Sequence, residues 1–299
     1  MTEAPPFAPH RTIRSFAEIS GGYDVALCDI WGVLHDGRSA FRAAGEALVA
    51  FRRGGGTVVL LTNAPRPSAD IRSQLTRFKI PDAAFDAIVT SGDVTIALIR
   101  ARGGAPVFHL GPARDAGLFD LAAQGMAARP ALAPLDGADY VVCTGLFDDT
   151  RETPADYEHS LQAMAARRLT MICANPDLVV HRGADLIYCA GALAQRYAAL
   201  GGEVVYAGKP YGPIYDEALG VAARARGAAI AKRCVIAIGD AMRTDIAGAV
   251  GQGIDALFIT SGIHRDDFER PGQALQDAIE MFCATHGLRP KAFADALAP

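Results

Sequence analysis

The chain has 299 residues, 51% hydrophobic and 21% charged, which is typical of a globular protein long enough for two modest domains. A formal net charge of −4 offers no basic field to hold a nucleic-acid backbone, so we expect no nucleic-acid partner. No apolar run approaches the roughly 20 residues that span a bilayer, and the polar, Pro-rich N-terminus lacks a signal-peptide core, so we expect no membrane partner.

Short apolar runs alternate along the chain with Ala-, Leu- and Arg-rich stretches typical of helices. Nine runs predict strands, at 23–34, 56–63, 85–92, 105–111, 138–145, 169–175, 203–209, 234–240 and 254–262. Because these runs are continuously apolar, they are typical of parallel strands covered by helices on both faces. The pattern predicts an α/β fold with a Rossmann-like doubly wound parallel sheet. Nine strands favour two sheets in two domains.

The six cysteines are scattered and form no CxxC pair. Four of them lie inside or beside the apolar runs: Cys28, Cys143, Cys173 and Cys234. Reduced, buried thiols fit this pattern better than disulfides or zinc ligands, and we therefore expect a cytoplasmic protein.

Several runs end in polar residues that are able to do chemistry. Asp29 ends the first run, Thr62 and Asn63 end the second, and Lys209 follows the seventh. In an open parallel sheet, function gathers at the carboxyl ends of strands. An exposed carboxylate there can act as nucleophile or metal ligand, and a lysine can hold a phosphate. Taken singly, each residue also fits a turn, a helix cap or a surface position.

The segment 238–255 carries the most specific signal. Asp240 follows a glycine at a strand end, and Asp245 lies five residues later at the start of an Ala/Gly-rich helix. Two carboxylates placed in this way suit a hard, oxygen-liganded ion such as Mg²⁺.

The ordered motifs D-x-x-G-V-L, L-L-T-N, G-K-P and G-D-x-x-R-T-D-I resemble those of the haloacid dehalogenase-like hydrolases, most closely class IIA. The resemblance extends from about residue 23 to 265. Two further pieces, TSGD at 90–93 and ANPD at 174–177, look like the same class. The resemblance implies a magnesium-dependent phosphatase acting on a small phosphorylated metabolite such as a sugar phosphate or nucleotide. Class IIA relatives are often dimers, so a homodimer is an open expectation.

The resemblance also implies a role for each matching residue. Asp29 matches the nucleophile that forms an aspartyl-phosphate, and Lys209 matches the lysine that holds nucleophile and phosphoryl group together. Thr62 and Asn63 match the phosphate-facing pair of the second motif. The implied Mg²⁺ ligands are Asp29, the backbone carbonyl of Trp31 and Asp240, with Asp245 orienting metal-bound water. Mg²⁺ and Lys209 would offset the repulsion between an anionic nucleophile and an anionic substrate.

Trp31 departs from the family pattern. Family phosphatases usually carry there a second aspartate, which acts as general acid and then general base. Indole cannot exchange protons at neutral pH, and loss of this help typically costs about 10²–10⁴ in rate. Three explanations stay open: His35 or Asp36 takes over proton transfer, the substrate has a good leaving group, or the protein is a slow enzyme or a phosphometabolite-binding protein.

The inserted domain of class IIA lies between the second and third motifs. We expect a hydrolase core at 1–103 plus 204–299 and an α/β cap at 104–203, which would exclude water and contact the leaving group. In the loop 174–183 the candidate specificity residues are Asp177, His181 and Arg182, for which turn and surface roles are equally good readings. Dehalogenase or phosphonatase chemistry is a third, weaker hypothesis. Dehalogenases need no metal pair like Asp240 and Asp245, and no phosphonatase-type lysine is assignable.

Overall fold

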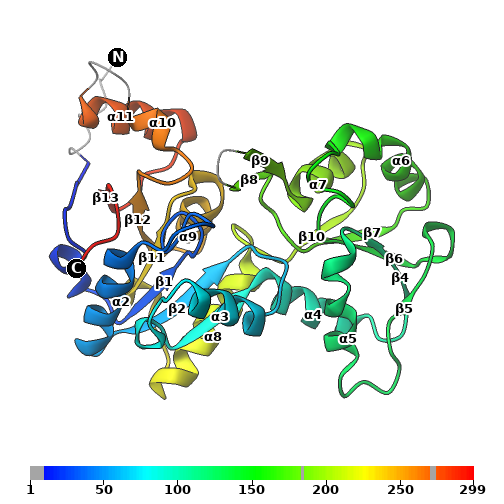
Figure 1. The fold of residues 1–299 in the computed structure, drawn as a ribbon, viewed down its shortest axis with the longest axis horizontal. Coiled ribbons are helices and arrows are strands. Elements are labelled where there is room, and N and C mark those ends of the chain that lie inside the picture. Colours follow the sequence, from blue (N-terminus) through cyan, green and yellow to red (C-terminus); the bar gives the residue numbers. More distant parts are fainter. Residues whose placement is uncertain (1–9, 183–184, 270–273) are drawn as a thin grey trace, which may run out of the picture.

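The computed structural model describes residues 10–182, 185–269 and 274–299. It contains two parallel sheets with helices packed on their faces, so the predicted α/β class is confirmed. Figure 1 shows them in two lobes side by side, with the second lobe in green. No helix in the described ranges is long and apolar enough to cross a membrane.

The first sheet has six parallel strands in the order β13-β12-β11-β1-β2-β3. Their bounds are β1 Val25–Cys28, β2 Thr57–Thr62, β3 Ala87–Thr90, β11 Val235–Gly239, β12 Asp255–Ile259 and β13 Ala292–Ala294. β1 lies between β2 and β11, so segments some 200 residues apart in sequence are neighbours at the centre. The chain order reverses there, and this is the position at which open α/β sheets bind ligands.

Helices cover both faces of the first sheet because successive strand residues point to opposite sides. Ala26 and Cys28 join the cluster that contains α2 (Arg42–Arg53) and α3 (Ser68–Arg77). Val25 and Leu27 join the cluster on the other face. The helices of that second cluster are α8 Gly212–Arg226, α9 Ala247–Gly251, α10 Arg265–Phe268 and α11 Leu275–His286. Both faces are therefore buried, as the continuous apolar runs predicted.

The second sheet has five parallel strands in the order β10-β7-β6-β4-β5. Their bounds are β4 Pro106–Leu110, β5 Ala131–Leu132, β6 Tyr140–Cys143, β7 Thr170–Cys173 and β10 Val204–Tyr206. The helices packed on it are α4 Ser91–Ala101, α5 Gly117–Ala123, α6 Glu158–Ala166 and α7 Ala190–Ala199. β10 lies after residue 203 yet pairs with β7, so the strands of the inserted unit continue to Tyr206. The division into a core of 1–103 plus 204–299 and a cap of 104–203 stays a prediction.

Four strands have no counterpart among the predicted runs, and two of them matter for the site. β8 (Val179–Arg182) and β9 (Asp185–Tyr188) form an antiparallel hairpin. In Figure 1 this hairpin projects from the green lobe toward the first lobe. The segment predicted as a loop is thus partly a hairpin, which lies near the carboxyl ends of the core strands. A short N-terminal helix, α1 (Ala17–Ser20), completes the core.

Candidate active site

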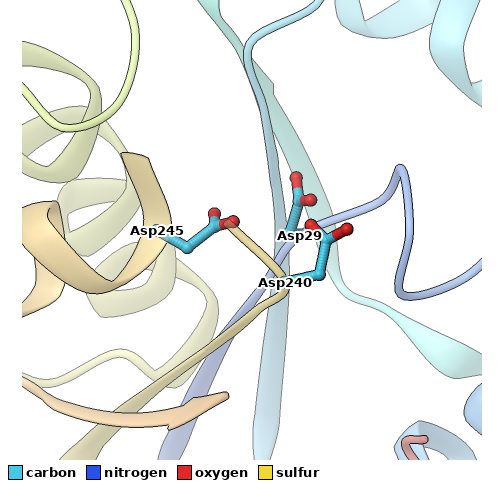
Figure 2. A group of neighbouring side chains, drawn as sticks. All are labelled: Asp29, Asp240 and Asp245. Atoms are coloured by element: carbon cyan, nitrogen blue, oxygen red, sulfur yellow. The ribbon is translucent and has the colours of Figure 1, made fainter. Parts of the chain in front are cut away.

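Three buried carboxylates meet at the carboxyl edge of the first sheet. Asp29 follows β1, Asp240 follows β11, and Asp245 lies in the π-helical turn Met242–Ile246. One oxygen from each side chain lies within 4.8 Å of the others. Figure 2 shows the carboxylates of Asp29 and Asp240 side by side, with that of Asp245 turned toward them. The carboxylates therefore face one shared space.

Lys209 ties two of these carboxylates together. Its Nζ donates to Asp29 Oδ1 and to Asp245 Oδ1, both at 2.6 Å, and also to the carbonyl of Leu61 at 3.2 Å. The lysine is only 3% exposed, so it is a buried cation with three oxygen partners. Because it is buried, Lys209 is not a surface residue, which was the alternative interpretation of its position in the sequence.

Two glycines enclose the Asp240 carboxylate. A Cβ built on Gly32 would lie 2.0 Å from Asp240 Oδ2, and one on Gly262 would lie 2.1 Å from it. The amide of Ile263, next to Gly262, donates to the same oxygen at 2.8 Å. Sequence reasoning passed over Gly262, although it ends the predicted strand at 254–262. Only glycine allows the backbone to approach the carboxylate this closely.

The charges of the cluster are compatible with a bound cation. Burial raises the pKa of Asp29 well above its ordinary value, and the nearby Asp245 adds to the effect while Lys209 opposes it. Burial, followed by the charge of Asp245, raises the pKa of Asp240 to about 7. Three buried carboxylates share one buried lysine, and buried carboxylates are otherwise stable when they coordinate a metal. An all-oxygen donor set of this kind fits Mg²⁺.

Thr62 and Asn63, the pair from the second motif, make different contacts. Thr62 borders the cavity over the carboxylates, and its Oγ1 accepts from the amide of Ala64 at 3.2 Å. Asn63 has its amide fully engaged: Oδ1 accepts from the Lys209 amide at 2.7 Å, and Nδ2 donates to the Lys209 carbonyl and to Asp177 Oδ1. Asn63 therefore holds the backbone of Lys209 in position.

Among the predicted cap residues, Asp177 is the one whose side chain the structure describes, and it lies at the site. Its carboxylate accepts from Asn63 at 2.9 Å and borders the same cavity. The side chains of His181 and Arg182 lie outside the described residues, although their backbone belongs to β8. The hairpin instead contributes Val179 and Val180 to the cavity wall, a pair that sequence reasoning left unassigned.

His35 and Asp36, the two residues expected to replace the acid at position 31, are both poorly suited to donate a proton. The His35 ring packs against Trp31 and Phe78, and its Nδ1 accepts from the Gly37 amide at 3.0 Å. Burial lowers the pKa of His35 to about 4, so the ring is neutral at physiological pH. Asp36 Oδ1 accepts from two backbone amides, and these bonds lower its pKa, so it is a carboxylate rather than an acid.

The carboxylates, Lys209 and Thr62 border a cavity of about 300 Å³ that Trp31 and the hairpin help to enclose. The geometry combines three buried carboxylates with a buried lysine at one edge of the sheet. Such a set can bind and attack an anionic phosphate.

Comparison with known proteins agrees with this class of site. Sequence models described as haloacid dehalogenase-like hydrolase and HAD-hydrolase-like match residues 26–123 and 206–280. A solved structure of a haloacid dehalogenase-like hydrolase from Brucella suis is 40% identical, covers 96% of this chain and all of its own, and superimposes with a TM-score of 0.83. The chain therefore belongs to the haloacid dehalogenase-like hydrolase family.

Within the family the chain belongs to class IIA, so the predicted resemblance and the predicted phosphatase-type enzyme are confirmed at this level. Ribonucleotide monophosphatase NagD of Escherichia coli is 27% identical over 241 residues, covering 79% of this chain and 87% of NagD. A structure titled a possible sugar phosphatase, from Cytophaga hutchinsonii, is 23% identical and covers 97% of this chain and 99% of its own. Its TM-score of 0.72 shows the shared fold.

Proposed function

We propose that this chain is a magnesium-dependent phosphatase of small phosphomonoesters that uses Asp29 as its nucleophile. The observation that carries the proposal is the Asp29 carboxylate itself. It is buried at the floor of a cavity, 2.6 Å from Lys209 Nζ, and faces the carboxylates of Asp240 and Asp245. NagD and the Cytophaga protein are named as phosphatases of a ribonucleotide and of a sugar, which supports a small phosphorylated metabolite as substrate.

In the proposed reaction, an oxygen of Asp29 attacks phosphorus and the ester P–O bond breaks. The leaving oxygen departs with the bonding electrons and takes up a proton. Water then attacks phosphorus, the bond between phosphorus and the Asp29 oxygen breaks, and inorganic phosphate leaves. Lys209 holds one oxygen of Asp29 in place and offsets part of the charge that the substrate brings.

Asp29, the backbone carbonyl of Trp31 and Asp240 would hold Mg²⁺, with Asp245 beside it. The ion would supply positive charge where negative charge gathers on the phosphoryl oxygens. Both oxygens of Asp245 already accept hydrogen bonds, Oδ1 from Lys209 and Oδ2 from the Ala241 amide at 3.1 Å. These bonds fix its carboxylate beside the cluster.

A second candidate function follows from Trp31. Neither His35 nor Asp36 is suited to replace the missing acid, because one is neutral with its Nδ1 occupied and the other is held as a carboxylate. This favours a slow enzyme that prefers good leaving groups, and in the limit a protein that binds phosphometabolites with little turnover. We place the slow enzyme first, since the nucleophile, lysine and carboxylates are all assembled.

The test is a screen of phosphorylated metabolites and p-nitrophenyl phosphate, with Mg²⁺ and with EDTA. We expect hydrolysis that requires Mg²⁺ and that Asp29→Asn abolishes, since the amide is near-isosteric but a poor nucleophile. Asp136→Asn, at an exposed position far from the cluster in sequence, is the matched control and should keep wild-type activity. A correctly folded Asp29→Asn protein with most of its activity would remove Asp29 from the proposed role.

A further inference from the structure

A second cavity of about 210 Å³ adjoins the one over the carboxylates. The two cavities share four bordering residues, which are Trp31, Thr62, Asp177 and Val180. A third cavity, bordered by Arg243, also adjoins the first and is not lined by Trp31 or Thr62. It shares five bordering residues with the first cavity, which are Asp177, Val179, Ala241, Thr244 and Ile263. A group attached to a phosphate at Asp29 can enter the second cavity between Thr62 and Trp31, which border both spaces.

The walls of the second cavity suit a small, partly apolar group. Trp31 and Tyr188 supply aromatic surface, and Ile71, Leu146 and Ile187 supply aliphatic surface. Its volume exceeds the roughly 150 Å³ of an apolar cavity that holds one benzene ring. A single ring with one substituent is therefore of suitable size.

Arg66 borders this cavity and makes no ion pair with a described residue, although Asp70 and the cavity residue Asp115 act on its charge from a distance. Arg114 pairs with Asp149, whereas Arg66 donates only from Nη2 to the side chain of Gln74, at 2.5 Å. Within the described ranges no carboxylate lies within 4 Å of the Arg66 guanidinium, which leaves most of its five N–H donors without a protein acceptor. Burial lowers the pKa of Arg66, and the charges of Asp70 and Asp115 offset only part of this effect.

The backbone of Arg66 is held by the TSGD segment at 90–93. The Gly92 amide donates to the carbonyl of Ala64 at 3.2 Å, and Asp93 Oδ1 accepts from the amide of Ser68 at 3.2 Å. A Cβ on Gly92 would lie 2.5 Å from the Arg66 carbonyl oxygen. This segment, which the proposed reaction does not use, therefore fixes the loop that presents Arg66.

We propose that Arg66 is a specificity-determining residue that binds an anionic substituent, such as a carboxylate, on the leaving group of the substrate. This inference rests on the proposed phosphatase function, because it assumes that the phosphate lies at Asp29. A guanidinium that binds a carboxylate makes two parallel charge-assisted hydrogen bonds, for which the open donors of Arg66 are available.

Binding can be measured without turnover because Trp31 is the only tryptophan in the chain. Its fluorescence therefore reports from the boundary of the two cavities. In the Asp29→Asn background, we titrate phenyl phosphate and its 2-, 3- and 4-carboxylated derivatives in the presence of Mg²⁺. We expect at least one carboxylated derivative to bind roughly 10-fold more tightly than phenyl phosphate, the size of one good charge-assisted interaction.

The variants separate binding from folding effects. Arg66→Ala should abolish the preference for the carboxylated probe and leave phenyl phosphate binding within about 3-fold, and Arg66→Lys should restore part of the preference. Arg243→Ala, which removes a cation from the third cavity, is the matched control. This variant should keep the preference for the carboxylated probe. Equal binding of all probes, equal weakening of all probes by Arg66→Ala, or loss of the preference in Arg243→Ala would each overturn the proposal.

Steady-state kinetics of the protein with wild-type Asp29 distinguish the failure of this proposal from the failure of the proposed function. If phenyl phosphate is hydrolysed but carboxylation gives no gain in kcat/KM or in affinity, the assignment of Arg66 fails and the phosphatase stands. If the carboxylate preference appears in binding but no phosphate ester is hydrolysed, the assignment of Arg66 stands and the phosphatase fails.

Discussion

Trp31 stands where the motif resemblance predicts a second aspartate. The indole packs edge-on against His35 and also fills the space beside Gly37, where an added Cβ would lie 2.7 Å from the ring. It borders both cavities and so lies where a leaving group would pass. The side chain therefore shapes the site but offers no proton.

We expect Trp31→Asp to raise kcat/KM for alkyl phosphates by about 10-fold or more, a part of the roughly 10²–10⁴ that general acid–base help supplies. Hydrolysis of p-nitrophenyl phosphate should change little, because its leaving group departs as an anion. Trp31→Phe is the control, since it removes the indole without adding an acid. Brisk hydrolysis of an unactivated sugar phosphate by the wild-type protein would contradict the slow-enzyme account.

His35 makes a separate prediction about stability and pH. Its pKa is lowered to about 4 in the folded state, whereas an unfolded histidine titrates near 6.5. Below pH 6.5 the unfolded chain therefore binds the proton first, and the free energy of unfolding falls as the pH drops toward 4. The loss from this group between pH 7 and pH 5 should be about 2 kcal/mol.

The measurement is urea unfolding of wild type and His35→Gln at pH 7 and pH 5. The glutamine variant should lose less stability over this interval, because it has no proton to take up, and contributions from the other histidines cancel in the comparison. An identical pH dependence in both proteins would show that His35 is not held neutral by burial.

At the scale of elements, the start of α7 supports the loop that brings Asp177 to the site. A Cβ on Gly191 would lie 2.2 Å from the carbonyl oxygen of Pro176 and 2.4 Å from that of Asp177. The Gly191 amide also donates to the Asp177 carbonyl at 3.1 Å. A larger residue at 191 must therefore push the loop away from the helix.

We expect Gly191→Ala to lower kcat/KM by about 10-fold or more, because displacements near 1 Å in a positioning group cost up to about 10² in rate. Gly251→Ala, at the end of α9, has no atom within 4 Å of the added Cβ and should be neutral. Steady-state kinetics with p-nitrophenyl phosphate measure the difference. If the two glycine variants behave alike, the loop does not depend on this contact.

At the scale of the whole molecule, Lys209 connects the two ends of the core. The chain returns from the second sheet at β10 and soon afterwards places this lysine between Asp29 and Asp245. Asn63 of the N-terminal half holds the lysine backbone through its amide. The candidate site is thus assembled only when both halves of the first sheet and the connecting segment are in place.

Lys209→Met should destabilise the fold by about 3–5 kcal/mol in EDTA, the usual cost of leaving buried charges unpaired. Mg²⁺ should recover part of this loss, because a ligand that binds only the folded state stabilises it. Thermal unfolding with EDTA and with Mg²⁺ measures both effects. A Mg²⁺ response no larger in Lys209→Met than in wild type would argue against a shared metal site.

Much of the architecture was readable from the sequence. The nine continuous apolar runs each contain a strand, because a parallel strand buried on both faces must be apolar throughout. The ordered motif residues Asp29, Thr62, Lys209 and Asp240 indicated the family, because each ends or follows a strand and carries a side chain suited to phosphate chemistry. Short or half-exposed strands such as β5 and β8 gave no such signal, since their side chains are not uniformly buried.

Only the tertiary structure showed which contacts and charge states the residues of the candidate site have. Asn63 bonds to the backbone of Lys209, a partner distant in sequence, and His35 is neutral because it is buried. Neither state can be read from the local sequence. Arg66 gave no signal in the sequence, since an arginine in a Pro-flanked loop is ordinarily a surface residue. Its lack of an ion pair with a described residue and its place in the second cavity arise only when both sheets and the loop from 64 to 68 come together.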